Sequence, residues 1–518
     1  MDLRDRLTEA AREHGVPGAA VAVWHDGELH EAATGVVNTA TGVETTTDSV
    51  FQVGSTTKVW TAALVMQLAE DGLVELDKPV GEYLPDFAFG GVTVRQLLTH
   101  TAGFDGDVFE DTGRGDDCLD RFLDHLRTAG HVHEPGELFS YCNAGYCVLG
   151  ALVARLRGGT WEQAIRERLL TPLGATHAAL FGEEAVLFRA SAGHVGPDAA
   201  VYPRWQMPRS NAPAGSTLCL APRELVAFGR ALAAGGLAPN GARLLADESV
   251  AAMLTPQVHV PGVGGALADR WGLGVELFGW GAFGHDGGTP GQSTFWRIVP
   301  GSGTSGIVPG SGTSGIVPGS GTSGIVPGSG TSGIVPGSGT SGIVPGSGTS
   351  GIVPGSGTSG IVPGSGTSGI VPGSGTSGIV PGSGFVIAMS GNGGSFFGLM
   401  ADVARPVIEE ATGLTVPAHP LPPQAPKPVD GASYAGRYTG PQLGYEVAAA
   451  GDGLDVTLIP GPFMESMGAT RTTTRYVHLD GESFIAVEAE GGRHDVVTFV
   501  MRDGRAAYLH NGRAVARD

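Results

Sequence analysis

The stretch Phe51-Gln-Val-Gly-Ser-Thr-Thr-Lys58 places one of only three lysines in the chain three residues after Ser55. The other two are Lys78 and Lys427, whereas arginine is abundant. Arginine keeps its proton in proteins, but a lysine amine can be made neutral by burial or by nearby positive charge. A lysine at this position therefore indicates a base beside a serine nucleophile, although the same spacing also arises by chance.

The residues after Ser55 predict a helix over 56–71. Apolar residues recur at helical spacing from Val59 onward, and Gly72 is placed to end the helix. Ser55 then stands where backbone N–H groups have no intrahelical partner and the helix dipole favours negative charge. Residues three apart share a helix face, so we expect the Ser55 hydroxyl to meet the Lys58 amine. One turn would supply a nucleophile, its base and half of an oxyanion hole.

A second motif, Tyr141-Cys-Asn143, precedes another predicted helix and is the only Tyr-x-Asn sequence in the chain. A lysine ammonium nearby would favour the phenolate, so we expect Tyr141 to exchange a proton with Ser55 and later to activate water. Asn143 also suits the N-cap of the helix that follows. Both readings of this motif stay open at this point.

The third motif lies in Gly284-His-Asp-Gly-Gly-Thr-Pro-Gly291, ahead of a predicted strand. The backbone at Gly287 and Gly288 can approach a ligand closely and can offer a second N–H group to a developing oxyanion. His285 is placed to orient Tyr141 or a substrate group. The same residues are also typical of an ordinary turn.

A nonapeptide, Ile-Val-Pro-Gly-Ser-Gly-Thr-Ser-Gly, recurs nine times without substitution from Ile298 and breaks off at Gly384. Each copy has two apolar residues and no charge, so it buries too little surface to offset the entropy of ordering. We predict a flexible insertion at a hairpin turn over 298–384, with a stacked β-solenoid as the ordered alternative. Identical copies indicate a recent duplication or an assembly artefact.

The remaining chain predicts an α+β main domain over 1–297 plus 385–415, because early strands and amphipathic helices are followed by further strands. A proline-rich linker follows at 416–428. Short alternating runs separated by Gly, Asp and Asn over 429–518 predict an antiparallel β-barrel or sandwich. No residue of that last domain suggests catalysis.

Charge and composition limit the partners of the chain. The net charge of −20 argues against nucleic acid and against an anionic membrane surface. The first residues are charged and carry no apolar signal segment, and no long apolar stretch occurs, so we expect a cytoplasmic protein. The four cysteines lack metal-ligand spacing and are interpreted as small buried apolar residues. No metal or other cofactor is expected, and the oligomeric state stays open.

The three motifs in this order resemble those of the serine β-lactamase and penicillin-binding-protein superfamily, in particular its class C-like esterase and D-peptidase branch. Flanking segments are similar to family segments in the same order: FQVGSTTK, LVELDKPVGEYLPDF, VTVRQLLTHTAGF, EPGELFSYCNAGYCVLG and PAGSTLCLAPRELVAFGRAL. The resemblance implies a β-lactamase/transpeptidase-like fold, in which an antiparallel sheet packs against helices and a helical lobe. His100 and Thr101 match a family segment and are interpreted as structural. The C-terminal β domain resembles modules appended to many such hydrolases.

The resemblance also implies roles for the motif residues. Ser55 would form an acyl-enzyme, Lys58 and Tyr141 would move its proton, and Asn143 would hold Lys58 or the substrate amide. The N–H groups of Ser55 and Gly288 would stabilise the oxyanion. His285-Asp-Gly287 stands where antibiotic-hydrolysing members have Lys-Thr-Gly, whose cation grips a substrate carboxylate, so efficient β-lactam hydrolysis is not expected.

Three functional hypotheses follow. The first is a serine hydrolase that acts through an acyl-enzyme on small esters or on D-amino-acid amides and peptides. The second is a D,D-carboxypeptidase or weak β-lactamase. The third belongs to another class, a non-catalytic binding or scaffold protein that keeps the fold and displays the repeat. Loss of ester turnover and of serine labelling in Ser55→Ala would separate the first two hypotheses from the third.

Overall fold

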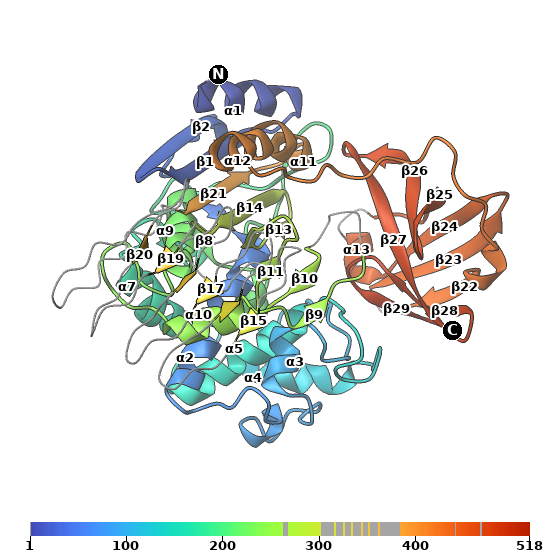
Figure 1. Ribbon diagram of the computed structural model, residues 1–518, viewed down its shortest axis with the longest axis horizontal. Coiled ribbons are helices and arrows are strands. Elements are labelled where there is room, and N and C mark those ends of the chain that lie inside the picture. Colours follow the sequence, from blue (N-terminus) through green and yellow to red (C-terminus); the bar gives the residue numbers. More distant parts are fainter. Residues whose placement is uncertain are drawn as a thin grey trace. The chain divides into compact units, whose positions relative to one another are not determined.

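The computed structural model describes residues 2–262, 268–301, 384–440, 442–466 and 469–518, with six two-residue strands inside 302–383. The chain divides into two compact units. One comprises Met1–Ile298 and Val386–Asp518, and the other comprises Val299–Phe385. The first unit contains both the sheet with its helices and a C-terminal barrel (Figure 1).

A ten-stranded sheet forms the centre of the main body. Its strands, in spatial order, are β3 (Val43–Glu44), β2 (Glu28–Asn38), β1 (Gly18–His25), β21 (Phe385–Gly391), β14 (Gln292–Val299), β12 (Phe283–Gly284), β11 (Glu276–Leu277), β10 (Arg270–Trp271) and β9 (Val258–His259), with β13 (Gly287–Thr289) paired to β14 beside this path. Both neighbours of β1 run antiparallel to it, with Val21 opposite Ala32 on one side and Met389 on the other. The first six residues of β1 are buried, as expected of an apolar run covered on both faces of a sheet.

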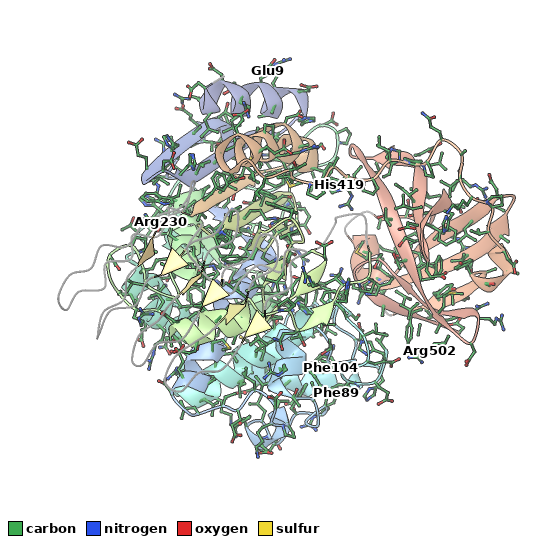
Figure 2. The ribbon with its side chains drawn as sticks, in the orientation of Figure 1. Glu9, Phe89, Phe104, Arg230, His419 and Arg502 are labelled. Atoms are coloured by element: carbon green, nitrogen blue, oxygen red, sulfur yellow. The ribbon has the colours of Figure 1, made fainter. Side chains whose placement is uncertain are left out.

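Helices surround this sheet. They are α1 (Leu3–Glu13), α2 (Thr57–Glu70), α3 (Val94–Leu98), α4 (Cys118–His125), α5 (Asn143–Arg157), α6 (Trp161–Ile165), α7 (Thr171–Leu173), α8 (Gly182–Ala185), α9 (Pro222–Ala233), α10 (Asp247–Met253), α11 (Phe396–Leu399) and α12 (Arg405–Thr412). Figure 1 shows α1, α11 and α12 near β1 and β2, with α2 to α5 at the opposite end of the body. In the loops beside α3, the rings of Phe89 and Phe104 stack with centroids 4.8 Å apart (Figure 2).

Helix α2 is the central helix of the body. Every residue from Thr57 to Leu68 is buried, and Gly72 follows the helix with a left-handed φ of +68°. A helix that is buried on all sides is held by packing, which fixes its first turn in place. That turn is preceded by a short 3₁₀ segment, Gly54–Thr56, which contains Ser55. The sequence prediction of a helix over 56–71 is confirmed to within one residue at each end.

The C-terminal domain is a closed antiparallel barrel of eight strands, which confirms the barrel alternative of the prediction. Its strands are β22 (Gly436–Thr439), β23 (Leu443–Ala450), β24 (Gly453–Pro460), β25 (Thr472–Asp480), β26 (Ser483–Glu490), β27 (Arg493–Arg502), β28 (Arg505–His510) and β29 (Ala514–Arg517). A short helix, α13 (Pro462–Ser466), follows β24. Alternate side chains such as Tyr438, Phe484 and Leu509 are fully buried inside the barrel. Residues 413–430, which include the predicted linker 416–428, form neither helix nor strand.

Almost all of the nonapeptide repeat lies outside the described residues. The prediction that the repeat is a flexible insertion therefore concerns residues outside the described ones. The six described strands pair antiparallel, as β15 (Gly315–Ile316) with β16 (Ile325–Val326), and as a run of β17 (Gly333–Ile334), β18 (Ile343–Val344), β19 (Gly351–Ile352) and β20 (Ile361–Val362). The strands β14 and β21, which flank the repeat in sequence, are neighbours in the main sheet. The domain limits drawn from the sequence stay predictions.

Candidate active site

Ser55 and Lys58 meet at the start of α2. The Lys58 amine donates a hydrogen bond to the Ser55 hydroxyl at 3.1 Å and another to the Ala214 carbonyl oxygen at 2.6 Å. The short strand β4 (Phe51–Gln52), paired to β8 (Cys219–Leu220), leads the chain to this turn. The side chain of Ser55 stays partly accessible, whereas that of Lys58 is fully buried. The serine therefore faces a ligand while its partner amine is shielded from water.

Burial changes the protonation of Lys58. Desolvation disfavours its ammonium form and, with a smaller contribution from the positive charge of Arg513, lowers its pKa to about 7. The nitrogen also lies 4.9 Å from the centre of the Tyr141 ring. At neutral pH a substantial fraction of Lys58 is a free amine within hydrogen-bond reach of a serine hydroxyl, which is the arrangement a general base requires.

Tyr141 lies against the same pair. Burial dominates and raises the pKa of its phenol far above its usual value, although the nearby Ser55 side chain lowers that pKa. The expectation that a neighbouring ammonium favours the phenolate is therefore wrong, because Lys58 and Tyr141 share one desolvated site. His100 stacks on the Tyr141 ring with centroids 4.3 Å apart, and its Nδ1 accepts a hydrogen bond from Cys142 N at 2.9 Å. Tyr141 is suited to pass a proton as a neutral phenol, and His100 holds its ring in place.

Asn143 is the first residue of α5 rather than its cap. The cap is Cys142, whose sulfur accepts a hydrogen bond from Gly145 N at 3.2 Å. This leaves the Asn143 side chain to line the cavity beside Ser55, where its Nδ2 donates to Asp107 Oδ1 at 3.0 Å.

All four cysteines are buried with free thiols. Thr101 hydrogen-bonds the side chain of Thr99 at 3.0 Å, in keeping with a structural role.

The third motif forms the edge strand β13, which folds back on β14 with Gly288 opposite Ser293. A methyl group built on Gly54 would lie 2.4 Å from the Gly288 nitrogen, and one built on Gly287 would lie 3.2 Å from the Ser55 nitrogen. The two backbones are thus in direct contact beside Ser55, and Gly54 also has a left-handed φ of +55°. This contact supports the pairing of the Ser55 and Gly288 N–H groups as an oxyanion hole, which stays a proposal.

His285 is buried behind this strand. Its Nδ1 donates to the Asp286 carbonyl oxygen at 2.5 Å, and its ring packs edge-on against Trp271 with centroids 5.3 Å apart. Burial and the charge on Lys58 lower the pKa of His285 to about 3, so it is neutral at physiological pH. The Tyr141 ring is 6.2 Å away between centroids. His285 packs beside Tyr141, and it supplies no positive charge.

Two cavities flank Ser55. One, of about 380 Å³, is lined by Asn143 together with apolar side chains that include Phe109 and Met207. The other, of about 300 Å³, is lined by the His285–Gly288 segment and by residues of the C-terminal barrel. Both share four lining residues: Ser55, Tyr141, Gly288 and Arg513. Among the described residues, no group of three His, Cys, Asp or Glu side chains is arranged to hold a metal ion.

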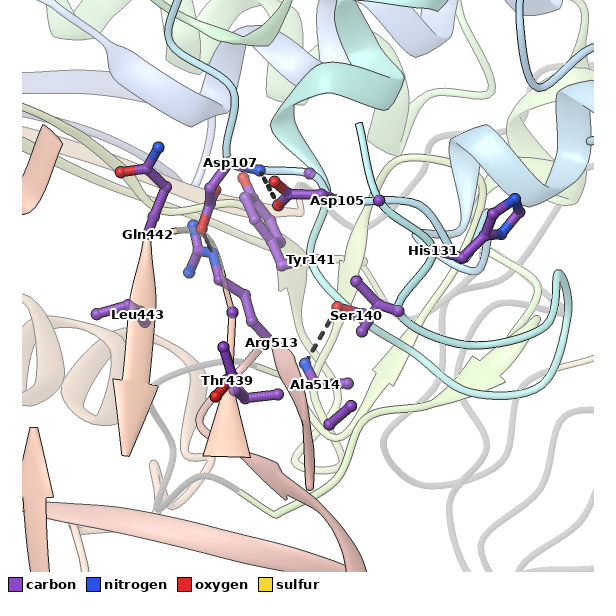
Figure 3. Close-up of a pocket in the computed structure, with 16 residues that line it drawn as sticks. Asp105, Asp107, His131, Ser140, Tyr141, Thr439, Gln442, Leu443, Arg513 and Ala514 are labelled. Atoms are coloured by element: carbon purple, nitrogen blue, oxygen red, sulfur yellow. Dashed lines mark hydrogen bonds and ion pairs between the residues drawn. The ribbon is translucent and has the colours of Figure 1, made fainter. Parts of the chain in front are cut away.

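Sequence reasoning missed the contribution of the barrel. Arg513, between β28 and β29, forms an ion pair with Asp107 and lies 5.2 Å from the centre of the Tyr141 ring. Figure 3 shows its guanidinium beside Tyr141 and directed at Asp107, in a further cavity lined by both domains. Since Arg513 lies 458 positions after Ser55 (513 − 55), no local pattern links the two. Its place in the loop Asn511-Gly-Arg513 was the one available signal, because functional residues concentrate in loops.

The predicted site residues therefore come together. Lys58, Tyr141, Asn143, Gly287 and Gly288 surround the accessible Ser55, and His285 lines one of the two cavities beside it. In the described part of the chain, no helix has both the length and the apolar character needed to cross a membrane.

Comparison with known proteins gives consistent matches. The family model described as Beta-lactamase matches residues 3–315. Penicillin-binding protein 4 of Amycolatopsis lactamdurans is 44% identical over 313 residues, which cover 58% of this chain and 82% of that protein. The putative penicillin-binding protein PbpX of Bacillus subtilis is 29% identical over 35% of this chain, and the match spans about half of its length (46%).

A solved structure matches along the whole chain. The crystal structure of SurE covers 100% of this chain and 99% of its own, with 28% sequence identity and a TM-score of 0.69. A second structure of the same protein, with D-Leu, gives 27% identity and a TM-score of 0.67, with 100% and 98% covered. These matches extend over both the sheet-and-helix body and the barrel.

Proposed function

We propose that this chain, which belongs to the Beta-lactamase family, hydrolyses small esters and amides of D-configured amino acids through an acyl-enzyme on Ser55. The coarser statement, that it is a serine hydrolase of this superfamily, follows from its membership. The proposal of an acyl-enzyme on Ser55 rests on the 3.1 Å contact between the Lys58 amine and the Ser55 hydroxyl, which lies beside two cavities.

In the proposed acylation step, the neutral Lys58 amine accepts the proton of the Ser55 hydroxyl as the serine oxygen attacks the substrate carbonyl carbon. The carbonyl oxygen becomes an oxyanion, which the N–H groups of Ser55 and Gly288 stabilise. The carbon then loses its leaving group, to which the proton returns by way of the Tyr141 phenol. Ser55 is left as an ester.

In the deacylation step, a water molecule attacks the Ser55 ester and gives up its proton to Lys58, directly or through Tyr141. The acid product leaves, and the proton on Lys58 returns to the serine oxygen. One water is consumed and one ester or amide bond is broken. Because the pKa of Lys58 is about 7, the amine can both accept and return a proton near neutral pH.

The preference for D-configured acyl groups rests on a relative. SurE has been crystallised with D-Leu, and its structure matches this chain over both domains. The cavity of about 380 Å³ presents Phe109 and Met207 to such a side chain. A D-leucyl group is therefore the first acyl group to test.

The experiment compares the native chain with Ser55→Ala and with Ser249→Ala, which removes a hydroxyl from α10 outside both cavities. The native chain and Ser249→Ala should turn over the 4-nitrophenyl ester of N-acetyl-D-Leu faster than its L-enantiomer. Both should also gain the mass of one acyl group or of one serine-directed phosphonate. Turnover and labelling that persist in Ser55→Ala would contradict the proposal, and equal rates for both enantiomers would contradict the D-preference.

The D,D-carboxypeptidase or weak β-lactamase alternative is tested in the same assay. His285 is neutral, so the third motif offers no fixed cation to a β-lactam carboxylate. We expect nitrocefin turnover no faster than in Ser55→Ala. Faster turnover in the native chain would favour the alternative.

A further inference from the structure

A separate cavity of about 630 Å³, the aromatic cavity, adjoins the cavity of about 380 Å³ beside Ser55, the acyl cavity. The two share three lining residues, which are Phe109, Met207 and Pro290. We propose that the aromatic cavity binds an aromatic side chain on the residue that precedes the D-configured acyl residue, so that the preferred substrates are peptidyl esters and amides. This inference rests on the proposed function and deepens it, since it names the acyl group that Ser55 accepts.

Four aromatic side chains line the aromatic cavity: Phe109, Phe181, Tyr202 and Trp205. The thioether side chain of Met207 lines it as well as the acyl cavity. Aromatic rings pack favourably against one another, and a methionine side chain adapts to groups of different shape. Concave sites with such linings are the usual binding sites for apolar groups. An aromatic ring is therefore the group that this cavity suits best.

The charged residues around the aromatic cavity are largely paired. Arg114 Nη2 donates to both carboxylate oxygens of Glu183, at 2.9 and 3.3 Å. Arg209 donates to Glu162 through Nε at 2.7 Å and through Nη2 at 3.2 Å. The remaining charged side chains in the lining carry opposite signs and are Asp111 and Arg204. Because the lining has no excess of either charge left to it, apolar contact rather than charge determines which group binds.

The walls of the aromatic cavity are held in place by contacts that do not depend on a ligand. Trp205 Nε1 donates to the Ser191 carbonyl oxygen at 2.8 Å. Arg209 Nη1 donates to the Arg114 carbonyl oxygen at 2.6 Å, and its guanidinium carbon lies 5.2 Å from the centre of the Phe181 ring. A cavity that is formed before the ligand arrives loses less entropy on binding.

The attachment to Ser55 determines which part of a substrate reaches the aromatic cavity. In the proposed function, the carbonyl carbon of the acyl residue lies at Ser55 and its side chain occupies the acyl cavity. The α-carbon has one further branch, the amino group, on which a peptide continues. A neighbouring residue adds about 3.5 Å of extended chain, which suits a step between two adjoining cavities. The leaving group is on the other side of the scissile bond, away from this branch.

The test uses 4-nitrophenyl esters of N-acetyl-X-D-Leu, in which X is L-Phe, Gly or L-Glu. The native chain should hydrolyse the phenylalanyl ester with a kcat/KM at least about tenfold higher than the glycyl ester, since one methylene in an apolar pocket already changes kcat/KM by roughly 10- to 200-fold. The glutamyl ester should not gain this factor. Equal values for the phenylalanyl and glycyl esters, or a glutamyl ester that is the best of the three, would overturn the proposal.

Two variants change the aromatic cavity at residues that line neither cavity beside Ser55. Phe181→Ala removes a ring from the lining. Gly182→Leu takes up part of the volume, and it can be accommodated because a methyl group built on Gly182 lies 3.4 Å from Gln206 Oε1 and 3.7 Å from the Trp205 ring. Both variants should bring the ratio between the phenylalanyl and glycyl esters close to one. A ratio that stays at its native value in both would overturn the proposal.

Phe397→Ala is the matched control. It removes a half-buried phenylalanine ring, as Phe181→Ala does, but from α11, outside the aromatic cavity and both cavities beside Ser55. The preference should persist, and its loss here would overturn the assignment to Phe181. If Phe181→Ala instead lowers turnover of the N-acetyl-D-Trp ester relative to N-acetyl-D-Leu and leaves the dipeptidyl ratio unchanged, the cavity belongs to the side chain of the acyl residue and the proposal falls.

A binding measurement separates this proposal from the proposed function. Calorimetric titration of Ser55→Ala with the amides of N-acetyl-L-Phe-D-Leu and N-acetyl-Gly-D-Leu should show tighter binding of the phenylalanyl amide. The difference should vanish in Ser55→Ala/Phe181→Ala. If the esters are turned over without Ser55 but the binding difference is found, the aromatic cavity stands and the acyl-enzyme falls. If Ser55 is labelled and required but both amides bind equally, the aromatic cavity falls alone.

Discussion

Lys58→Met should make the chain catalytically inactive and, at neutral pH, more stable. The native pKa of Lys58 is about 7, against 10.5 for an unperturbed lysine side chain. At pH 7 the unfolded chain therefore holds nearly a full proton on Lys58, whereas the folded chain holds about half of one. Because the unfolded state binds more protons, the free energy of unfolding rises with pH between these two pKa values.

The magnitude follows from the size of the shift. At roughly 1.4 kcal/mol per pKa unit, the native state is destabilised by about 4 kcal/mol at pH 7 and by only about 1 kcal/mol at pH 9.5. Methionine has a similar length and no charge, so the variant escapes this penalty but leaves the Ala214 carbonyl oxygen without its partner, at a cost of about 1–3 kcal/mol. The variant should be more stable at pH 7 and lose most or all of that advantage by pH 9.5.

Urea-induced unfolding of both proteins, followed by tryptophan fluorescence at the two pH values, measures this difference. Groups other than Lys58 titrate alike in the two proteins, so the change in their stability difference, about 3 kcal/mol, isolates the lysine. A difference that is the same at both pH values would refute the reasoning that burial has neutralised Lys58. It would also remove the physical basis for Lys58 as a general base.

Three further outcomes are expected. Gly54→Ala should reduce kcat/KM for the D-leucyl ester by at least about 100-fold, because a methyl group there would lie 2.4 Å from Gly288 N. The control, Gly72→Ala, has a similar φ and open space around it and should be active. Tyr141→Phe should lower kcat by about 10²- to 10⁴-fold with little change in melting temperature, because the ring that packs in the core is kept; near-native activity would exclude the phenol from proton transfer. Deletion of the nine full repeats, residues 298–378, should leave activity intact. It should also raise the melting temperature, because closing the longer loop costs roughly 3 kcal/mol. An inactive deletion variant would contradict this expectation.

The first two motifs were predictable because their chemistry is local. Ser55 and Lys58 share one helical turn, and the apolar pattern after them predicts the helix that brings their side chains together. Tyr141 precedes a second helix and Asn143 begins it, at the place where the sequence predicts a helix start. That Cys142 rather than Asn143 caps this helix was not predictable, since both side chains offer an acceptor and packing decides which one faces the helix end.

The sequence by itself determined which groups are available: a serine with a lysine one turn later, a phenol before a helix, glycines near a strand, and a series of short antiparallel strands at the end of the chain. Only the tertiary structure decided their protonation and their neighbours. Burial lowers the pKa of Lys58 and raises that of Tyr141, and desolvation depends on everything packed around a group rather than on its sequence neighbours. The same holds for Arg513, which lies beside Tyr141 because the barrel docks its loop there. One of the docking bonds, from Tyr141 N to the Gly512 carbonyl oxygen, joins two backbones and has no side-chain signature in the sequence.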